Sequence, residues 1–211
     1  DSFNTDVFSI FGQYSVDLSD VTELSLEGRY DKEKRSVNNN VPERSSALYY
    51  GGGAPINPAM TAGGSKIPSR DKSFDQFQPK ISLTTTGENT TVYASYGVGF
   101  RSGGFNSSGS AATTEFWLNS GNPFGLGVVG AQLGVSDTFK KEVSKSFELG
   151  FKGRYLDGRL EVNGAIFETD VDDNQFFEFF AGPWGLLRVV TNIDQLDISG
   201  SELDFKYAVS D

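Results

Sequence analysis

Residues 92–101 read VYASYGVGFR, and this stretch decides the fold class. From Val92 to Arg101 the even-numbered positions are apolar or aromatic, whereas most odd-numbered positions are Ser, Gly or Arg. Because successive side chains of a β-strand point to opposite sides, an alternation of period two indicates a strand with one apolar and one polar face. The run from Ile81 to Thr85 alternates in the same way, and the intervening Gly87-Glu88-Asn89 predicts a tight turn. The sequence therefore predicts a β-hairpin here.

The same pattern predicts two further hairpins. The first joins residues 7–17 to residues 24–30 through the turn residues Leu18-Ser19-Asp20. The second joins residues 147–155 to residues 160–167 through Asp157-Gly158, a dipeptide typical of two-residue hairpin turns. One more strand is expected within residues 189–209. Long helical periodicity is absent, so the expected fold class is all-β, an antiparallel meander of about seven strands.

Long segments separate the hairpins, at about residues 36–72, 102–141 and 170–186. The short turns must then lie at one end of the sheet and the long segments at the other. Bacterial outer-membrane β-barrels have this arrangement, with short periplasmic turns and long extracellular loops. In such a barrel the polar strand faces line the lumen and the apolar faces meet lipid. The aromatic girdle at the membrane interface is expected to include Tyr30, Tyr96 and Tyr155, which lie near strand ends.

The number of strands predicts that the chain is an internal piece of a larger barrel. Bacterial single-chain barrels have an even number of strands, from about eight upward, and lipid does not tolerate open sheet edges. Seven strands are odd and too few, so further strands are expected beyond Asp1 and Asp211.

The composition agrees with β structure and excludes several functions. The chain has 25 Gly and 18 Phe, and aromatic residues make up 13% of it, which suits pleated surfaces. Without Cys and His, a disulfide framework, thiol or imidazole catalysis and Cys- or His-based metal sites are excluded. The formal net charge of −10 argues against a nucleic-acid partner and against polybasic binding to a membrane surface. No apolar run approaches the ~20 residues of a transmembrane helix, and no signal peptide begins at Asp1.

Three segments resemble the barrel of TonB-dependent receptors. Residues 79–83 followed by residues 92–106 are similar to the family's pattern lYaSYskGFRsGGFN. Residues 147–170 are similar to yElGfKs..ldgRl.lngavFytdy. Residues 190–203 are similar to vtNaGka.i.GvEle, with departures at Ile193-Asp194 and Ser201. The three segments stand in the family's order and span nearly the whole chain, so residues 1–211 are identified as a partial barrel of this family.

The resemblance implies a barrel of about 22 strands, of the size class known for outer-membrane transporters. It also implies an N-terminal plug domain inside the barrel and a motif that engages the TonB energy-transducing complex, neither of which this sequence contains. Family members import ferric siderophores, haem, cobalamin or glycans across the outer membrane of Gram-negative bacteria. The expected function is therefore that of an active-transport receptor for a scarce nutrient such as a ferric siderophore. No enzyme activity, catalytic residue, cofactor or bound metal is expected, and the expected partners are outer-membrane lipid, the TonB complex and the nutrient.

Candidate ligand contacts lie where the predicted strands meet the long segments. Arg101, on a polar face, could attract an anionic chelate, although pairing with a carboxylate such as Glu148 is the alternative. Aromatic clusters could contact a hydrophobic ligand, although interfacial packing is the alternative. Their candidate residues are Phe116, Trp117, Phe176, Phe179 and Trp184. Asp170, Asp172 and Asp173 lack the Gly and distal Glu of a calcium loop, so a solvated strand end is expected there.

Two other functions are compatible with parts of the pattern. A passive porin would share the barrel but lack the plug and the TonB-binding motif. A soluble β-sandwich, such as a glycan-binding module, would bury its apolar strand faces in a closed core. Those faces include Phe8, Ile10, Leu24, Leu26, Leu149 and Phe151.

Overall fold

The computed structural model describes residues 1–40, 67–114, 134–182 and 185–209. In these ranges the chain forms a short helix and strands of very different lengths. The elements are β1 (Ser2–Ser19), β2 (Thr22–Asn38), β3 (Arg70–Thr86), β4 (Thr90–Arg101), β5 (Gly104–Phe105), α1 (Ser110–Thr114), β6 (Thr138–Phe139), β7 (Glu142–Tyr155), β8 (Leu160–Gly182) and β9 (Gly185–Tyr207). None of the described residues forms a helix long and apolar enough to cross a membrane.

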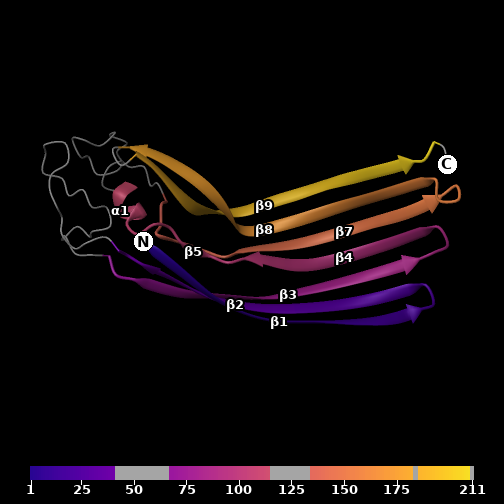
Figure 1. Ribbon diagram of the computed structural model, residues 1–211, viewed down its shortest axis with the longest axis horizontal. Coiled ribbons are helices and arrows are strands. Elements are labelled where there is room, and N and C mark those ends of the chain that lie inside the picture. The colour runs from indigo at the N-terminus through magenta and orange to yellow at the C-terminus, as the bar shows by residue number, and fades with distance from the viewer. Residues whose placement is uncertain (41–66, 115–133, 183–184, 210–211) are drawn as a thin grey trace, which may run out of the picture.

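A single seven-stranded antiparallel sheet has the order β1-β2-β3-β4-β7-β8-β9. Neighbours in the sheet follow one another along the chain, and the small β5–β6 ribbon lies between β4 and β7 in sequence. Figure 1 shows the turns β1–β2, β3–β4 and β7–β8 at one end of the sheet, here called the turn end. The connections β2–β3, β4–β7 and β8–β9 are made at the other end, the loop end. The N-terminus lies at the loop end and the C-terminus at the turn end (Figure 1). The predicted meander from a large barrel is confirmed, and within this chain the barrel is not closed.

One face of the sheet is apolar because the strand register brings alternating apolar residues side by side. A row across the sheet runs through Leu24, Leu83, Ala94, Leu149 and Ile166. This face is exposed: the exposed fraction is 61% for Phe8 and Ile10 and 39% for Leu149. The β-sandwich hypothesis is therefore wrong, since it requires these side chains in a closed core.

Aromatic residues mark the ends of the apolar face. Toward the loop end, Tyr30 lies opposite Phe77 and Tyr96 opposite Phe147. Two positions further along β2 the same face carries Lys32, where the apolar alternation of this strand ends. Tyr155 lies at the turn end of β7, as expected for the second girdle.

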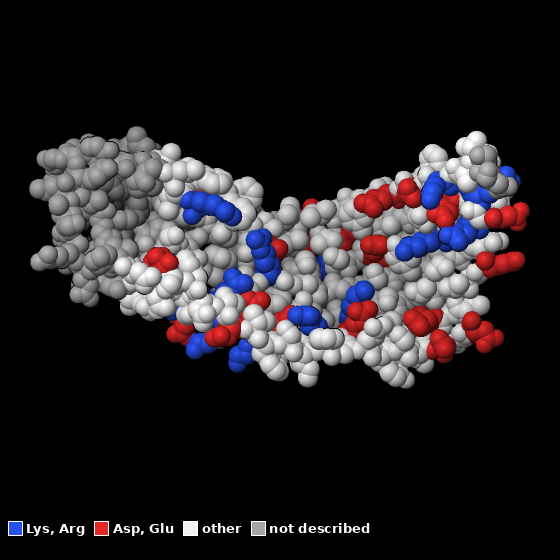
Figure 2. All heavy atoms as spheres, in the orientation of Figure 1, with Lys and Arg blue, Asp and Glu red and all other residues white. Residues whose placement is uncertain are grey.

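The opposite face is polar, and side chains from neighbouring strands form ion pairs and hydrogen bonds across it. Lys80 Nζ lies 3.2 Å from Glu27 Oε1, and the hydroxyl of Tyr93 donates a hydrogen bond to Glu148. Figure 2 shows Lys, Arg, Asp and Glu side chains spread along the sheet on this side. The two faces thus differ in chemistry over most of their length.

Aromatic rings on the strands lie directly over glycines on the neighbouring strands. Tyr93 lies opposite Gly150, and a Cβ added at Gly150 would lie 2.5 Å from the hydroxyl oxygen of Tyr93. Phe167 covers Gly200 in the same way, with a Cβ-to-ring distance of 2.7 Å. A side chain at either position would have to displace the ring, which occupies that space.

Replacing Gly150 by alanine is expected to lower the free energy of unfolding by about 1–2 kcal/mol, a typical effect of overpacking. The added methyl group must displace the Tyr93 ring and break the bond to Glu148. Tyr93→Phe removes only that hydrogen bond and should cost about 1 kcal/mol or less. Denaturant unfolding of the complete protein in lipid vesicles measures both values. A Gly150→Ala variant more stable than Tyr93→Phe would contradict the packing explanation.

The predicted third loop at residues 170–186 is wrong. β8 and β9 instead continue as one paired hairpin as far as Gly182 and Gly185. The run from Phe176 to Phe180 places aromatic residues on both faces, so the alternation that identifies a strand is lost, while pairing with β9 keeps the backbone extended. The ladder is interrupted at Asp173, which has a positive φ of 52°. The other predicted long segments are also shorter than expected or partly structured: β2 ends at Asn38, β3 begins at Arg70, and residues 102–141 include β5, α1 and β6.

Candidate ligand-binding region at the loop end

Buried hydrophobic side chains of the described residues gather at the loop end. They are Val37, Phe74, Val171 and Val189. The β5–β6 ribbon packs against one of them, Phe74, at Gly103, which precedes β5. A Cβ added at Gly103 would collide with the ring of Phe74 and would lie 2.6 Å from the carbonyl oxygen of Phe139. No side chain therefore fits at Gly103, between the Phe74 ring of β3 and the backbone of Phe139 and Lys140.

Two asparagines join the ribbon to the β8–β9 hairpin in a reciprocal arrangement. Asn106, after β5, accepts a hydrogen bond from the Val190 N–H at 2.7 Å and donates one to the Val190 carbonyl at 2.9 Å. Asn192, on β9, accepts from the Lys140 N–H at 2.8 Å and donates to the Lys140 carbonyl at 3.2 Å. Each amide satisfies both backbone groups of one residue, as a neighbouring strand would. We call this pair the asparagine clasp.

Gln175 strengthens the same junction from β8. Its Nε2 donates to the carbonyls of Ser102 at 2.9 Å and Lys140 at 3.0 Å. Its backbone N–H donates to Glu142 Oε2 at 2.7 Å. Because Gln175 is buried, these bonds are shielded from water and fix the ribbon and the hairpin as one unit.

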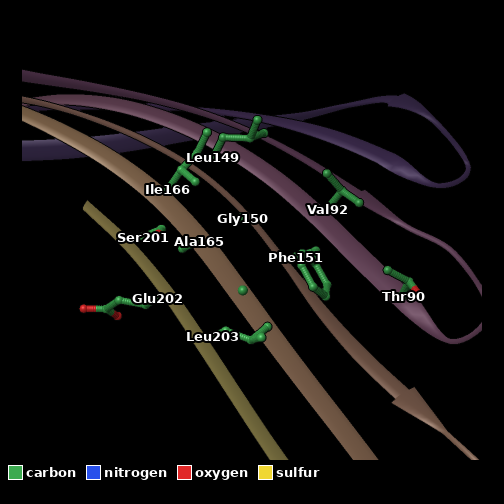
Figure 3. Close-up of a pocket in the computed structure, with 11 residues that line it drawn as sticks. Thr90, Val92, Leu149, Gly150, Phe151, Ala165, Ile166, Ser201, Glu202 and Leu203 are labelled. Atoms are coloured by element: carbon green, nitrogen blue, oxygen red, sulfur yellow. The ribbon is translucent and has the colours of Figure 1, made fainter. Parts of the chain in front are cut away.

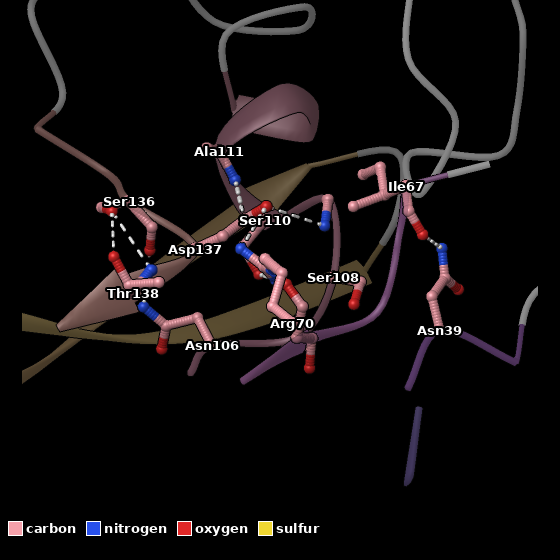
Figure 4. A network of polar contacts seen from close by, with 12 residues as sticks. Asn39, Ile67, Arg70, Asn106, Ser108, Ser110, Ala111, Ser136, Asp137 and Thr138 are labelled. Carbon is pink, nitrogen blue, oxygen red and sulfur yellow. Dashed lines mark hydrogen bonds and ion pairs between the residues drawn. The ribbon is translucent and has the colours of Figure 1, made fainter. Parts of the chain in front are cut away.

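Asp137 organises the start of the segment that carries α1 (Figure 4). Its carboxylate accepts hydrogen bonds from the backbone N–H of Ala111 at 3.0 Å and of Gly109 at 3.3 Å. Arg70 Nη1, from the start of β3, lies 3.5 Å from Asp137 Oδ2, and its guanidinium lies 5.4 Å from the centre of the Phe105 ring. This network connects β3, β5, α1 and β6 at the loop end.

Two of the three acidic residues considered for a calcium site, Asp172 and Asp173, are paired with lysines. Lys140 Nζ donates to Asp173 at 2.8 Å, and Lys145 Nζ to Asp172 at 2.7 Å. The hydrogen bond and the charge of Asp173 raise the pKa of Lys140 above its ordinary value. Within the described ranges, no cluster of three or more acidic residues is arranged to hold a metal ion.

The predicted contact residues that the structure describes do not form one cluster. Arg101 is exposed at the end of β4, opposite Glu142, and makes no salt bridge among the described residues. The alternative pairing of Arg101 with Glu148 is wrong, because Glu148 lies opposite Ser95 and accepts its hydrogen bond from Tyr93. Phe176 and Phe179 are on opposite faces of the β8–β9 hairpin, and both are exposed. The remaining candidates, Phe116, Trp117 and Trp184, lie outside the described residues.

Sequence reasoning missed the asparagines that hold this region together. Asn106 and Asn192 both stand within the segments that resemble the TonB-dependent receptors, so a signal was present. Their role depends on contacts with Val190 and Lys140, which no local pattern predicts. Arg188 was missed for the same reason: its environment is set by pairing between β8 and β9.

A shallow groove of about 630 Å³ lies away from this region. Figure 3 shows it crossing β4, β7, β8 and β9, with Leu149, Phe151 and Leu203 among its lining residues. Gly164 and Ser201 are small residues in its lining. It opens mainly on the apolar face, so it does not belong to the loop-end region.

An antiparallel sheet with one exposed apolar face, one polar face and all longer connections at one end is a wall segment of a membrane β-barrel. The family model described as "TonB dependent receptor-like, beta-barrel" matches residues 1–210. The chain therefore belongs to the TonB-dependent receptor β-barrel family, which is a family of transporters and receptors of Gram-negative outer membranes and not of enzymes.

Solved structures of such receptors have the same fold. The ferric yersiniabactin uptake receptor of Yersinia pestis is 16% identical, with a TM-score of 0.61 over 99% of this chain and 25% of its own length. The copper transporter OprC is 15% identical, with a TM-score of 0.62 over 98% of this chain and 27% of its own. The hemophore receptor of Serratia marcescens is 17% identical, with a TM-score of 0.57 over 97% of this chain and 32% of its own. The chain thus spans about a quarter to a third of these proteins, and at such identities the likeness concerns the fold.

Proposed function

We propose that this chain forms part of the barrel wall of an outer-membrane receptor that imports a scarce nutrient, such as a ferric siderophore, with energy from the TonB complex. The observation that carries the proposal is the exposed apolar face bounded by aromatic residues, in a chain of the TonB-dependent receptor family. An exposed apolar surface of this extent is unfavourable in water and favourable in lipid.

The faces and ends of the sheet then have distinct roles. The apolar face contacts lipid, and the polar face, with Lys80, Glu27 and Glu148, borders the lumen and a plug domain. The loop end faces the outside of the cell, so residues 36–72, 102–141 and 170–186 lie on the side from which the nutrient arrives. The relatives of known structure transport or receive iron chelates, copper and haem, which favours a metal-bearing nutrient.

The ligand contacts are proposed at the loop end. The asparagine clasp and Gln175 hold the ribbon and the hairpin rigidly together there, and rigid supports are needed for specific recognition. The contact residues proposed are Arg101, Phe116, Trp117, Phe176, Phe179 and Trp184.

Energised uptake by the complete receptor that carries this chain tests the proposal. Cells that produce it as their outer-membrane receptor are expected to take up a ferric chelate, haem or copper only when TonB is present. Uptake is measured with radioactive metal in matched strains with and without TonB. Equal uptake in both strains would indicate a passive porin, and no uptake of any of these nutrients would contradict the proposed function.

A further inference from the structure

One face of the β8–β9 hairpin carries an arginine stacked on an aromatic ring. The Arg188 guanidinium lies 3.8 Å from the centre of the Phe177 ring. Phe179 lies directly opposite Arg188 in the strand register and is 61% exposed, and Leu186 next along β9 is 71% exposed. Side chains two residues apart on a strand share a face, so these four residues lie together. We call them the cation–aromatic ledge.

The ledge points to the same side as the contacts that hold the ribbon. Gln175 and Asn192 share the face of Phe177 and Arg188, and their amides reach Ser102 and Lys140 beside the ribbon. Figure 1 shows the end of this hairpin beside α1 at the loop end. The ledge therefore lies over the interior side of the barrel wall, where an arriving ligand would pass.

Among the described residues, Arg188 has no anionic partner. The described part of the chain gives it no salt bridge, although the protein has a net charge of −10 and most of its described arginines are paired with Asp or Glu. The register places Phe177, Phe179 and Val190 beside it, and none of these is acidic. An arginine that only stabilises the fold commonly donates hydrogen bonds to a carboxylate or a carbonyl. Arg188 is instead exposed, so its N–H groups can donate to a ligand.

We infer that the cation–aromatic ledge of Phe177, Phe179, Leu186 and Arg188 binds an anionic ligand that bears a flat aromatic group. The inference rests on the proposed function and specifies the chemical class of the imported nutrient. The anion receives hydrogen bonds from the edge of the Arg188 guanidinium, which Phe177 holds in one plane. The aromatic group of the ligand packs on Phe179 and Leu186, which are exposed and have apolar surface to cover.

Binding of three ferric chelates to the complete purified receptor, measured by isothermal titration calorimetry, tests the inference. The probes are a ferric tris-catecholate, which is anionic and aromatic; ferric dicitrate, which is anionic and aliphatic; and a ferric trihydroxamate, which is neutral and aliphatic. The tris-catecholate is expected to bind about tenfold tighter than either of the others, because only it matches both the charge and the ring. Equal or tighter binding of either aliphatic probe, or no binding of the tris-catecholate, overturns the inference.

Variants separate the ledge from general effects on the protein. Arg188→Gln is expected to weaken tris-catecholate binding by about 10- to 100-fold, the usual range for a lost charge-assisted contact. Arg188→Lys keeps the charge but loses the planar fork and should weaken it by about 3- to 10-fold. The matched control is Arg159→Gln, an exposed arginine at the turn end, which should leave affinity unchanged.

Each variant is used only if its barrel retains heat-modifiable migration on gels, and Arg188→Lys provides a mild second substitution if Arg188→Gln does not fold. Unchanged affinity in a folded Arg188 variant overturns the inference. A further result separates the inference from the proposed function. If the receptor takes up the neutral trihydroxamate only with TonB, and the Arg188 variants keep their affinity, the proposed function holds but the ledge is not its ligand-binding site.

Discussion

Replacing Gly103 by alanine is expected to lower the free energy of opening of the β5–β6 ribbon by about 3 kcal/mol or more, which corresponds to a more than 100-fold faster amide exchange there. A Cβ at this position would overlap the Phe74 ring and would lie 2.6 Å from the Phe139 oxygen and 2.8 Å from the Lys140 carbonyl carbon. Two of these three neighbours are backbone atoms, so no change of rotamer relieves the collision. The β5 and β6 sides of the ribbon must move apart, and the ribbon must also shift on the Phe74 ring of β3.

Hydrogen exchange followed by mass spectrometry on the complete receptor measures this effect. Peptides that cover residues 102–106 and 138–141 should exchange faster, while peptides from the turn end of β1 and β2 remain protected. Gly12→Ala is the matched control, because an added Cβ at Gly12 has no heavy atom within 4 Å. Unchanged exchange in the ribbon of Gly103→Ala would mean that the close approach of Gly103 to Phe139 and Lys140 is not required.

Replacing Asn106 by aspartate is expected to lower the free energy of opening of the same junction by about 2–3 kcal/mol, as for a buried polar group deprived of its partner. The substitution keeps the side-chain shape and the acceptor for the Val190 N–H. It removes the Nδ2 donor that bonds the carbonyls of Ser136 and Val190, and it places a negative charge beside both oxygens. Asn106 is only 6% exposed, so water cannot replace the lost donor.

The expected result is exchange about 30- to 150-fold faster in the ribbon and in the β8–β9 hairpin together. Faster exchange in both segments is expected because the asparagine clasp joins the ribbon to the hairpin. A contact within one loop would change exchange in that loop alone. Asn4→Asp, at an exposed site on β1, makes the same chemical change and should have no effect. Faster exchange in the ribbon alone would show that Gln175 and Asn192 hold the hairpin without Asn106.

The strands at the centre of the sheet were predictable from sequence because their pattern is local. Alternation over residues 92–101 fixes which side chains share a face, and Asp157-Gly158 fixes where a hairpin turns. Gly158 has a φ of 87°, which glycine adopts without strain. Both features depend on residues within a few positions of one another. They were sufficient to predict the antiparallel meander, its two faces and its two unlike ends.

The sequence located the region of the candidate site but not which of its side chains share a face of the sheet. Aromatic composition marks a region of the chain, whereas the face of each side chain depends on strand pairing. Phe176 and Phe179 were selected as aromatic residues in a loop, yet they belong to a strand and point to opposite sides of it. Phe177 and Arg188 were not selected, because they become neighbours only when β8 pairs with β9.

By itself, the sequence determined the strands, the short turns, the apolar and polar faces and the likeness to one receptor family. Only the tertiary structure decided that residues 170–186 continue a paired hairpin and that Asn106 binds Val190, 84 positions along the chain. The physical reason is that periodicity and turn chemistry act between near neighbours. Backbone groups of the ribbon and the hairpin acquire partners only when segments far apart in sequence meet.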